Sequence, residues 1–131
     1  MGESSSRLWR KREAERRGRS SETLAALLLT LKGYRVLGRR IKTHAGEIDL
    51  IARAPSGVVC FVEVKSRAAL AQAAEALGMR QQERIARAAE LYLARRPGLA
   101  AKGVRFDMVM LAPRAWPKHI RDAWRPERGS R

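Results

Sequence analysis

Carboxylates are scarce in the middle of this chain, and their spacing indicates a metal-binding site. The chain has 131 residues, with 28 Lys and Arg against 13 Asp and Glu. From residue 18 to residue 67 the only acids are Glu22, Glu47, Asp49 and Glu63. Successive side chains of a strand point to opposite faces, so Glu63 and Lys65 share one side of their strand. If a hairpin pairs that strand with the preceding one, Asp49 converges on the same side.

Two neighbouring carboxylates repel each other unless a positive charge lies between them. Asp49 and Glu63 are 14 residues apart, a separation that a hairpin can fold back to adjacency. Mg²⁺ prefers oxygen ligands and commonly takes one or two carboxylates, which leaves positions for water and phosphate. We therefore expect an Mg²⁺ site, with Mn²⁺ as the alternative ion, and Lys65 within reach of the attacking water or the scissile phosphate. The other interpretation is an ordinary half-exposed strand with a cross-strand ion pair, in which Glu47 and Asp49 cap the neighbouring strand.

A helix must carry the fourth acid of this region, Glu22. Helical spacing places it in a stripe whose other members are small or apolar, namely Gly18, Ala25 and Leu29. A carboxylate on such a face requires a partner or a metal. A second stripe, formed by Leu24, Leu27, Leu28 and Leu31, is predicted to face the core, and Gly33 is a plausible end of the helix.

The remaining pattern alternates between strands and helices. The expected elements in chain order are a helix over 13–31, strands over 34–40, 47–53 and 58–65, helical pieces over 69–96 that break near Gly78, and a strand over 104–111. Residues 54–57 have the composition of a hairpin turn. The order α-β-β-β-α-β predicts an α/β fold with a mixed sheet flanked by helices.

The size and charge of the chain limit its organisation and its partners. We expect a flexible basic arm over 1–12, one domain over 13–112, and a basic C-terminal extension over 113–131 that packs on the domain or trails from it. A net charge of +15 indicates a polyanionic partner. A single cysteine, Cys60, excludes an internal disulfide and indicates a reducing, cytoplasmic location. The longest apolar run is too short to span a membrane, and a homodimer is compatible with the sequence.

Cations next to the carboxylates are candidates for phosphate contacts, although a solvated basic loop is an equally good interpretation of them. The candidate nucleic-acid-binding residues are Arg39, Arg40, Lys42, Arg67 and Arg84. His44 and His119 are expected to be surface or loop histidines. Trp9, Trp116 and Trp124 lie in the basic ends of the chain, where they could stack on bases or pack against the domain.

Several motifs together resemble the YraN family of bacterial proteins, over about Gly18 to Leu111. They are Gly18-x-x-x-Glu22, Gly33-Tyr34, Gly46-Glu47-Ile48-Asp49-Leu50-Ile51, Phe61-Val62-Glu63-Val64-Lys65-Ser66-Arg67 and Arg105-Phe106-Asp107. The resemblance implies a fold similar to the restriction-endonuclease and Holliday-junction-resolvase superfamily, with its PD-(D/E)xK motif. In that pattern Asp49 is the central metal ligand, Glu63 the second ligand, Val64 a backbone-carbonyl ligand, Lys65 the catalytic lysine and Glu22 the helix carboxylate. This chain has Gln81-Gln82 where the family usually carries Lys-Gln.

The leading hypothesis is a metal-dependent nuclease that hydrolyses phosphodiesters of DNA, with branched molecules or repair intermediates as possible substrates. In it, Glu22, Asp49 and Glu63 hold one or two Mg²⁺ ions, while Lys65 offsets developing charge. The alternative is a non-catalytic basic nucleic-acid-binding protein with a vestigial nuclease site. A weaker third hypothesis is a ribosome- or RNA-associated basic protein. The complete Asp-Glu-Lys set favours the enzyme, because a binding domain needs no carboxylates facing a polyanion.

Overall fold

The structure, a computed structural model, describes residues 20–66 and 78–126 of the chain. Five strands form one sheet in the order β1-β2-β3-β4-β5. Their bounds are Arg35–Lys42 for β1, Glu47–Arg53 for β2, Val59–Ser66 for β3, Val104–Leu111 for β4 and Lys118–Trp124 for β5. The expected strands over 47–53 and 104–111 are confirmed in full, and the other two are shifted by one or two residues. The predicted arm over 1–12 lies outside the described residues.

Strand directions in this sheet are mixed, as predicted. Strands β1, β2 and β3 form an antiparallel meander, whereas β3 and β4 pair in parallel and β4 and β5 pair antiparallel. A parallel pair requires a crossover, and here the crossover contains α3, which spans Met79–Ala94. Gly78 precedes the first residue of α3, and the helix ends shortly before Pro97-Gly98. The helical piece predicted before Gly78 lies outside the described residues.

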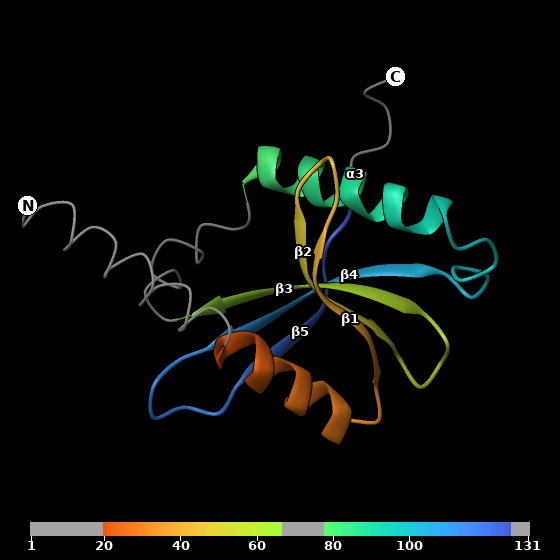
Figure 1. The fold of residues 1–131 in the computed structure, drawn as a ribbon. Coiled ribbons are helices and arrows are strands. Elements are labelled where there is room, and N and C mark those ends of the chain that lie inside the picture. Colours follow the sequence, from red (N-terminus) through yellow and green to blue (C-terminus); the bar gives the residue numbers. More distant parts are fainter. Residues whose placement is uncertain (1–19, 67–77, 127–131) are drawn as a thin grey trace, which may run out of the picture.

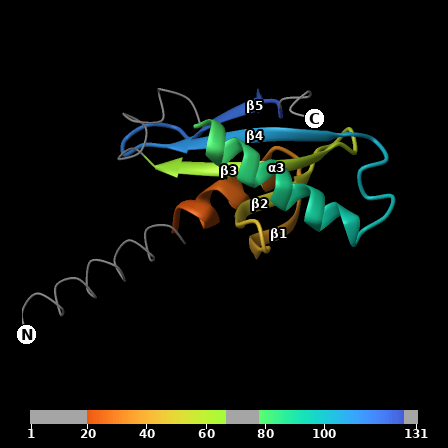
Figure 2. The ribbon, with the colours of Figure 1, turned by 90° about the horizontal axis from the view of Figure 1, so that it is seen from above.

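Helices cover both faces of the sheet, so the architecture has three layers. Residues 20–31 form a helix on one face, and α3 lies across the other (Figure 1). The view from above shows α3 crossing in front of the strands, with the 20–31 helix behind them (Figure 2). On β2 and β3, Leu50 and Val62 pack with the 20–31 helix, while Ile51 and Phe61 pack with α3.

The buried face of the 20–31 helix is not the leucine stripe that its spacing suggested. Leu24, Leu27 and Leu31 are 52%, 55% and 78% exposed within the described part of the chain. Ala25, Ala26 and Leu29 are buried instead, and Glu22 is only 5% exposed. The prediction was therefore wrong for three of the four leucines, whereas Leu28 is partly buried and packs against the core. The small alanines let the helix lie close to the sheet, which a row of leucines would not allow.

The C-terminal segment contributes a strand that the sequence did not predict. Its strand β5 pairs with β4 at the edge of the sheet. Trp124 is buried and stacks on Phe106 with a centroid distance of 4.3 Å, whereas Trp116 is 93% exposed. Up to Trp124, then, the basic extension belongs to the sheet.

Two further sequence expectations concern single features of the chain. Cys60 is a free cysteine, and it is fully buried in the core between β3 and the 20–31 helix. Within the described residues, the structure contains no helix that is both long and apolar enough to cross a membrane.

Candidate metal centre

Strands β2 and β3 bring the predicted carboxylates together. Leu50 pairs with Val62 in the antiparallel register, so Asp49 and Glu63 occupy the next opposed positions and point to the same face. Burial raises the pKa of both carboxyl groups, and the charge of Asp49 raises that of Glu63 further, as expected for two acids in close proximity. The predicted pairing of Asp49 with Glu63 is thus present in the structure.

Asp49 is held against the backbone of β3. Its Oδ2 atom accepts a hydrogen bond of 2.8 Å from the amide of Val64. Burial raises the pKa of Asp49, while the Val64 amide and the positive charge of Lys65 act in the opposite direction. The backbone of Val64 therefore does meet the site, through its N–H. Whether its carbonyl serves as a ligand stays a prediction.

Glu63 has two further partners around one oxygen. Its Oε1 atom accepts a hydrogen bond of 3.0 Å from Nε2 of Gln81 on α3, and Nζ of Lys65 lies 3.4 Å away. Burial, and then the charge of Asp49, raises the pKa of Glu63 from 4.5 to about 7. Glu63 therefore releases its proton at a higher pH than an ordinary glutamate. A divalent cation bound between the carboxyls would compete with that proton.

Glu22 is placed differently from the other acids. It comes from the helix on the opposite face of the sheet, and its carboxylate lies 3.7 Å from Nε of Arg39 and 3.6 Å from Nε of Arg40. Burial raises its pKa, Arg40 lowers it, and the charge of Asp49 raises it further. Glu22 is thus within electrostatic reach of Asp49. Its predicted role as a metal ligand is not tested by this arrangement.

Arg40 links two of the acids. Its Nε atom lies 3.5 Å from Oε1 of Glu47 and 3.6 Å from Glu22. The backbone leaves the extended conformation at this residue, where φ is +49°, an uncommon value for a side-chain-bearing residue in a strand. Arg39 also donates a hydrogen bond of 2.7 Å to the hydroxyl of Thr23. Both arginines that were predicted to grip phosphates therefore have protein partners, which the sequence did not indicate.

A small cavity opens beside the carboxyl pair. It has a volume of about 120 Å³, and it is lined by Gly46, Glu47, Glu63, Gln81, Arg84 and Ile85. Arg84, another predicted nucleic-acid-binding residue, thus lies next to Glu63. Lys42 is exposed at the end of β1, and Arg67 lies outside the described residues. The sequence singled out Gln81 as a departure from the family motif without assigning it a role, and the structure shows that its side chain contacts Glu63.

The donor set suits a hard cation that takes few protein ligands. Within the described residues, no three or more His, Cys, Asp or Glu side chains gather closely enough to hold a metal ion. Proteins commonly bind Mg²⁺ through one or two carboxylates, and water completes its coordination shell. Zinc sites require three or four protein ligands. Asp49 and Glu63 therefore fit Mg²⁺ or Mn²⁺ and do not fit a structural zinc.

A second group of polar residues is buried at the β4–β5 pair. Asp107 accepts hydrogen bonds of 2.8 Å from two guanidinium nitrogens of Arg105, 2.8 Å from Nε2 of His119 and 3.0 Å from the amide of Asp122. Although burial alone would raise it, these contacts hold the pKa of Asp107 down at about 2. The expectation of a surface His119 was wrong, because only 2% of its side chain is exposed. This group ties the sheet edge together.

Comparisons with known proteins now place the chain. Residues 21–111 match the Uncharacterised protein family UPF0102, which is the YraN family. The chain belongs to this family. A UPF0102 protein of Paramagnetospirillum magneticum is 57% identical over 86% of this chain and 89% of its own length. Another from Parvibaculum lavamentivorans is 55% identical over 86% of this chain and 84% of its own. The matched range contains all the carboxylates described above and ends before β5.

Proposed function

We propose that this UPF0102 protein is a metal-dependent nuclease that hydrolyses phosphodiester bonds of DNA. The observation that carries the proposal is the half-buried pair of Asp49 and Glu63, which face each other across β2 and β3, with Lys65 3.4 Å from Glu63 and a cavity beside them. A strongly basic protein that only bound a polyanion would gain nothing from two carboxyls at such a place. Perturbed carboxyl pKa values in a cleft are typical of functional sites.

Each residue then has a distinct task. Asp49 and Glu63 would hold the ion, and the hydrogen bond from the Val64 amide keeps Asp49 oriented. When bound, Mg²⁺ would lower the pKa of a coordinated water and stabilise charge on the phosphate. Lys65 would place its ammonium group near the scissile phosphate. Gln81 fixes the rotamer of Glu63 from the other side of the cavity. The water oxygen bonds to phosphorus as the bond to the leaving oxygen breaks, and that oxygen takes up a proton.

One experiment separates this proposal from failure of the fold. Linear, flapped and branched DNAs are incubated with the purified protein and Mg²⁺ or Mn²⁺, with Asp49→Asn and Lys65→Ala as matched variants. We expect cleavage by the native chain, and a loss of more than about a hundredfold in Asp49→Asn, since a metal ligand is removed. Calorimetric titration of Mn²⁺ into both proteins shows whether the loss follows the metal. Lack of cleavage together with lack of metal binding would contradict the proposal.

A binding-only function is the second candidate, and one observation favours it. Without a metal, each acid of the site already has a protein partner, since Glu22 is paired with arginines and Glu63 with Lys65 and Gln81. Such a closed arrangement is also what a vestigial nuclease site would show. In that case the native chain would bind DNA without cutting it, and Asp49→Asn would leave the affinity unchanged or higher, because it removes a negative charge.

A further inference from the structure

Two cavities lie between α3 and the turn that joins β1 and β2, and together they are called the groove. One wall is α3, and the other is the turn between β1 and β2. The cavity beside Glu63 lies at one end of this groove. A larger cavity of about 450 Å³ lies at the other end, and its walls include Lys42, His44, Leu91, Tyr92, Arg95 and Arg96. Because both cavities are bordered by the same turn and the same helix, they follow each other along α3.

The α3 wall carries a stripe of arginines. They are Arg80, Arg84, Arg87 and Arg95. With Leu91 between the last two, each position follows the one before it by three or four residues, so all of them share one face of the helix. All four are exposed, and none has a side-chain partner among the residues that the structure describes. From Arg80 to Arg95 the stripe is about 22 Å long at the 1.5 Å rise of a helix.

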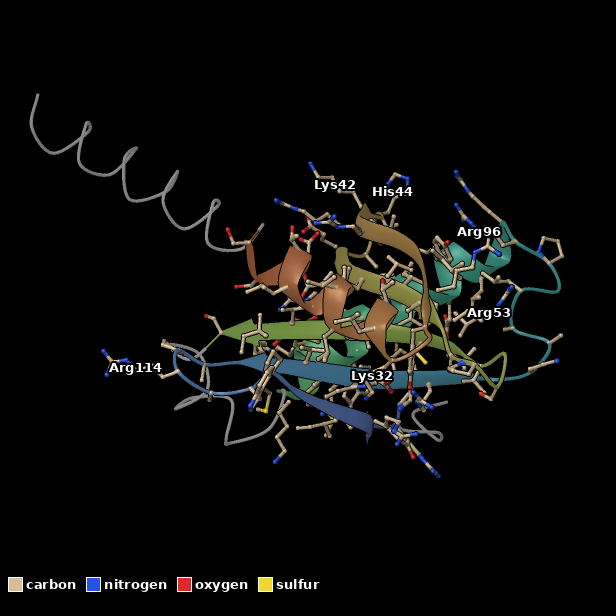
Figure 3. All side chains as sticks on the ribbon, turned by 90° about the horizontal axis from the view of Figure 1, so that it is seen from below. Lys32, Lys42, His44, Arg53, Arg96 and Arg114 are labelled. Carbon is tan, nitrogen blue, oxygen red and sulfur yellow. The ribbon has the colours of Figure 1, made fainter. Side chains whose placement is uncertain are left out.

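The opposite wall is a turn fixed by its own hydrogen bonds. The hydroxyl of Thr43 accepts hydrogen bonds of 3.1 Å from the amides of Ala45 and Gly46 and donates one of 2.7 Å to the carbonyl of Gly46. Lys42 and His44 flank this threonine and are exposed. Figure 3 shows both side chains projecting from the end of the hairpin, with Arg96 on the same side of the molecule and Arg114 at the far end. The backbone that carries Lys42 and His44 is therefore fixed by the turn's own hydrogen bonds.

The larger cavity also offers a flat surface, the exposed guanidinium plane of Arg96 over the buried ring of Tyr92. The guanidinium of Arg96 stacks over the ring of Tyr92, 3.8 Å from its centroid, and donates a hydrogen bond of 3.1 Å to the Tyr92 carbonyl. Leu91 beside them is 40% exposed. A guanidinium plane supported by an aromatic ring is a surface on which unpaired nucleobases stack. Bases inside a duplex already stack on each other and cannot use it.

We propose that this groove binds a single-stranded segment of nucleic acid. One unpaired base stacks on the Tyr92–Arg96 pair, and neighbouring phosphates contact Lys42, His44 and Arg95. This inference rests on the proposed nuclease function in one respect, namely that the bound nucleic-acid strand runs along the groove toward the carboxyl pair. The 14 helical steps from Gln81 to Arg95 span about 21 Å, or about six nucleotides at a stacked rise of about 3.4 Å. The preferred substrates are therefore molecules with an unpaired tail, such as flaps and splayed arms.

Binding without metal tests the groove independently of catalysis. The affinity of a fluorescent 12-nucleotide single strand and of the matching duplex is measured in EDTA by anisotropy. The proteins are the native chain, Lys42→Glu, Arg95→Glu and the control Arg114→Glu, which makes the same charge change on the exposed β4–β5 turn. We expect Lys42→Glu and Arg95→Glu to weaken single-strand binding by about tenfold or more, and Arg114→Glu to weaken it by less than about threefold. Equal losses in all three variants would overturn the proposal.

Cross-linking locates the base. A photoreactive thymine is moved along the oligonucleotide, and the linked peptides are identified by mass spectrometry. We expect adducts within residues 91–96 or 42–46, and adducts spread evenly over the surface would overturn the proposal. The two proposals fail separately. Binding and cross-linking at the groove without cleavage in Mg²⁺ would refute the nuclease proposal and support the groove proposal. Cleavage by the native chain, together with equal single-strand affinities of Arg95→Glu and Arg114→Glu, would support the nuclease proposal and refute the groove proposal.

Discussion

Glu63 connects the electrostatics of the site to a measurable pH dependence. Its pKa is raised from 4.5 to about 7, so the folded protein binds this proton more tightly than the unfolded chain does. The stability that this proton contributes is complete below about pH 4.5 and is lost as the pH rises through about 7. A metal ion must displace the same proton, so its affinity has the opposite dependence and increases with pH over this window.

The first prediction follows from that competition. The increase in Tm produced by Mn²⁺ should be larger at pH 8 than at pH 6, because Glu63 is ionised only at the higher pH. Thermal melts at the two pH values, with and without the ion, measure this. Glu63→Gln serves as the matched variant, and its Tm should not respond to Mn²⁺ at either pH. The same Mn²⁺ effect at both pH values in the native chain would show that the ion binds elsewhere.

The parts of the site predicted from the sequence are those that follow from local rules. Alternation along two strands and one turn sufficed to bring Asp49, Glu63 and Lys65 together. The hydrogen bond from Gln81 depends on where α3 lies over the sheet, and the pairing of Glu22 with Arg40 depends on an unusual backbone conformation in β1. His119 was misjudged because β5 itself was not predicted. These contacts join segments that are distant in the sequence, so the residue pattern within one segment does not predict them.

Among the elements, the 20–31 helix shows how a periodic pattern can favour the wrong face. Two stripes were available, one of leucines and one containing Glu22, Ala25 and Leu29. The leucine stripe is the more apolar, yet the small stripe is buried, because close approach to the sheet decides the packing. The strands were predicted more accurately, since their buried runs are bounded by turns at residues 43–46 and 54–57.

The second prediction compares two leucines of this helix. Leu29→Ala should lower the free energy of unfolding by about 2–5 kcal/mol, because it leaves a cavity under a fully buried residue. Leu27→Ala, at a side chain that is 55% exposed, should cost less than about 1 kcal/mol. Urea denaturation followed by circular dichroism measures both. If Leu27→Ala proved as costly as Leu29→Ala, residues outside the described ranges would have to cover the leucine face.

At the scale of the whole molecule, the net charge of +15 dominates encounters with polyanions. The arginine stripe of α3 concentrates part of that charge on one side. The N-terminal residues 1–12 add Arg7, Arg10, Lys11 and Arg12 against Glu3. Since these residues lie far in sequence from the carboxyl pair, we expect them to contribute attraction and not chemistry.

The third prediction is a steep dependence of DNA affinity on salt. A plot of log affinity against log salt should have a slope of about −0.9 for each phosphate that the protein neutralises on a duplex. Removing residues 1–12 should flatten this slope and leave any cleavage in place. Anisotropy titrations between about 50 and 200 mM salt measure the slope. An affinity that does not change over this range would contradict a polyanionic partner.

The single buried thiol of Cys60 can report how often the protein opens around it. Burial raises the pKa of this thiol to about 11, so in the native state it is both inaccessible and protonated. A thiol reagent can therefore react only while β3 is transiently released from its neighbours, and the labelling rate measures how often that happens. Because Cys60 lies three residues before Glu63 on the same strand, a metal bound at the carboxyl pair should slow labelling in proportion to its occupancy. The labelling rate of Cys60 would then serve as a binding assay for metal and nucleic acid that needs no other probe on the protein.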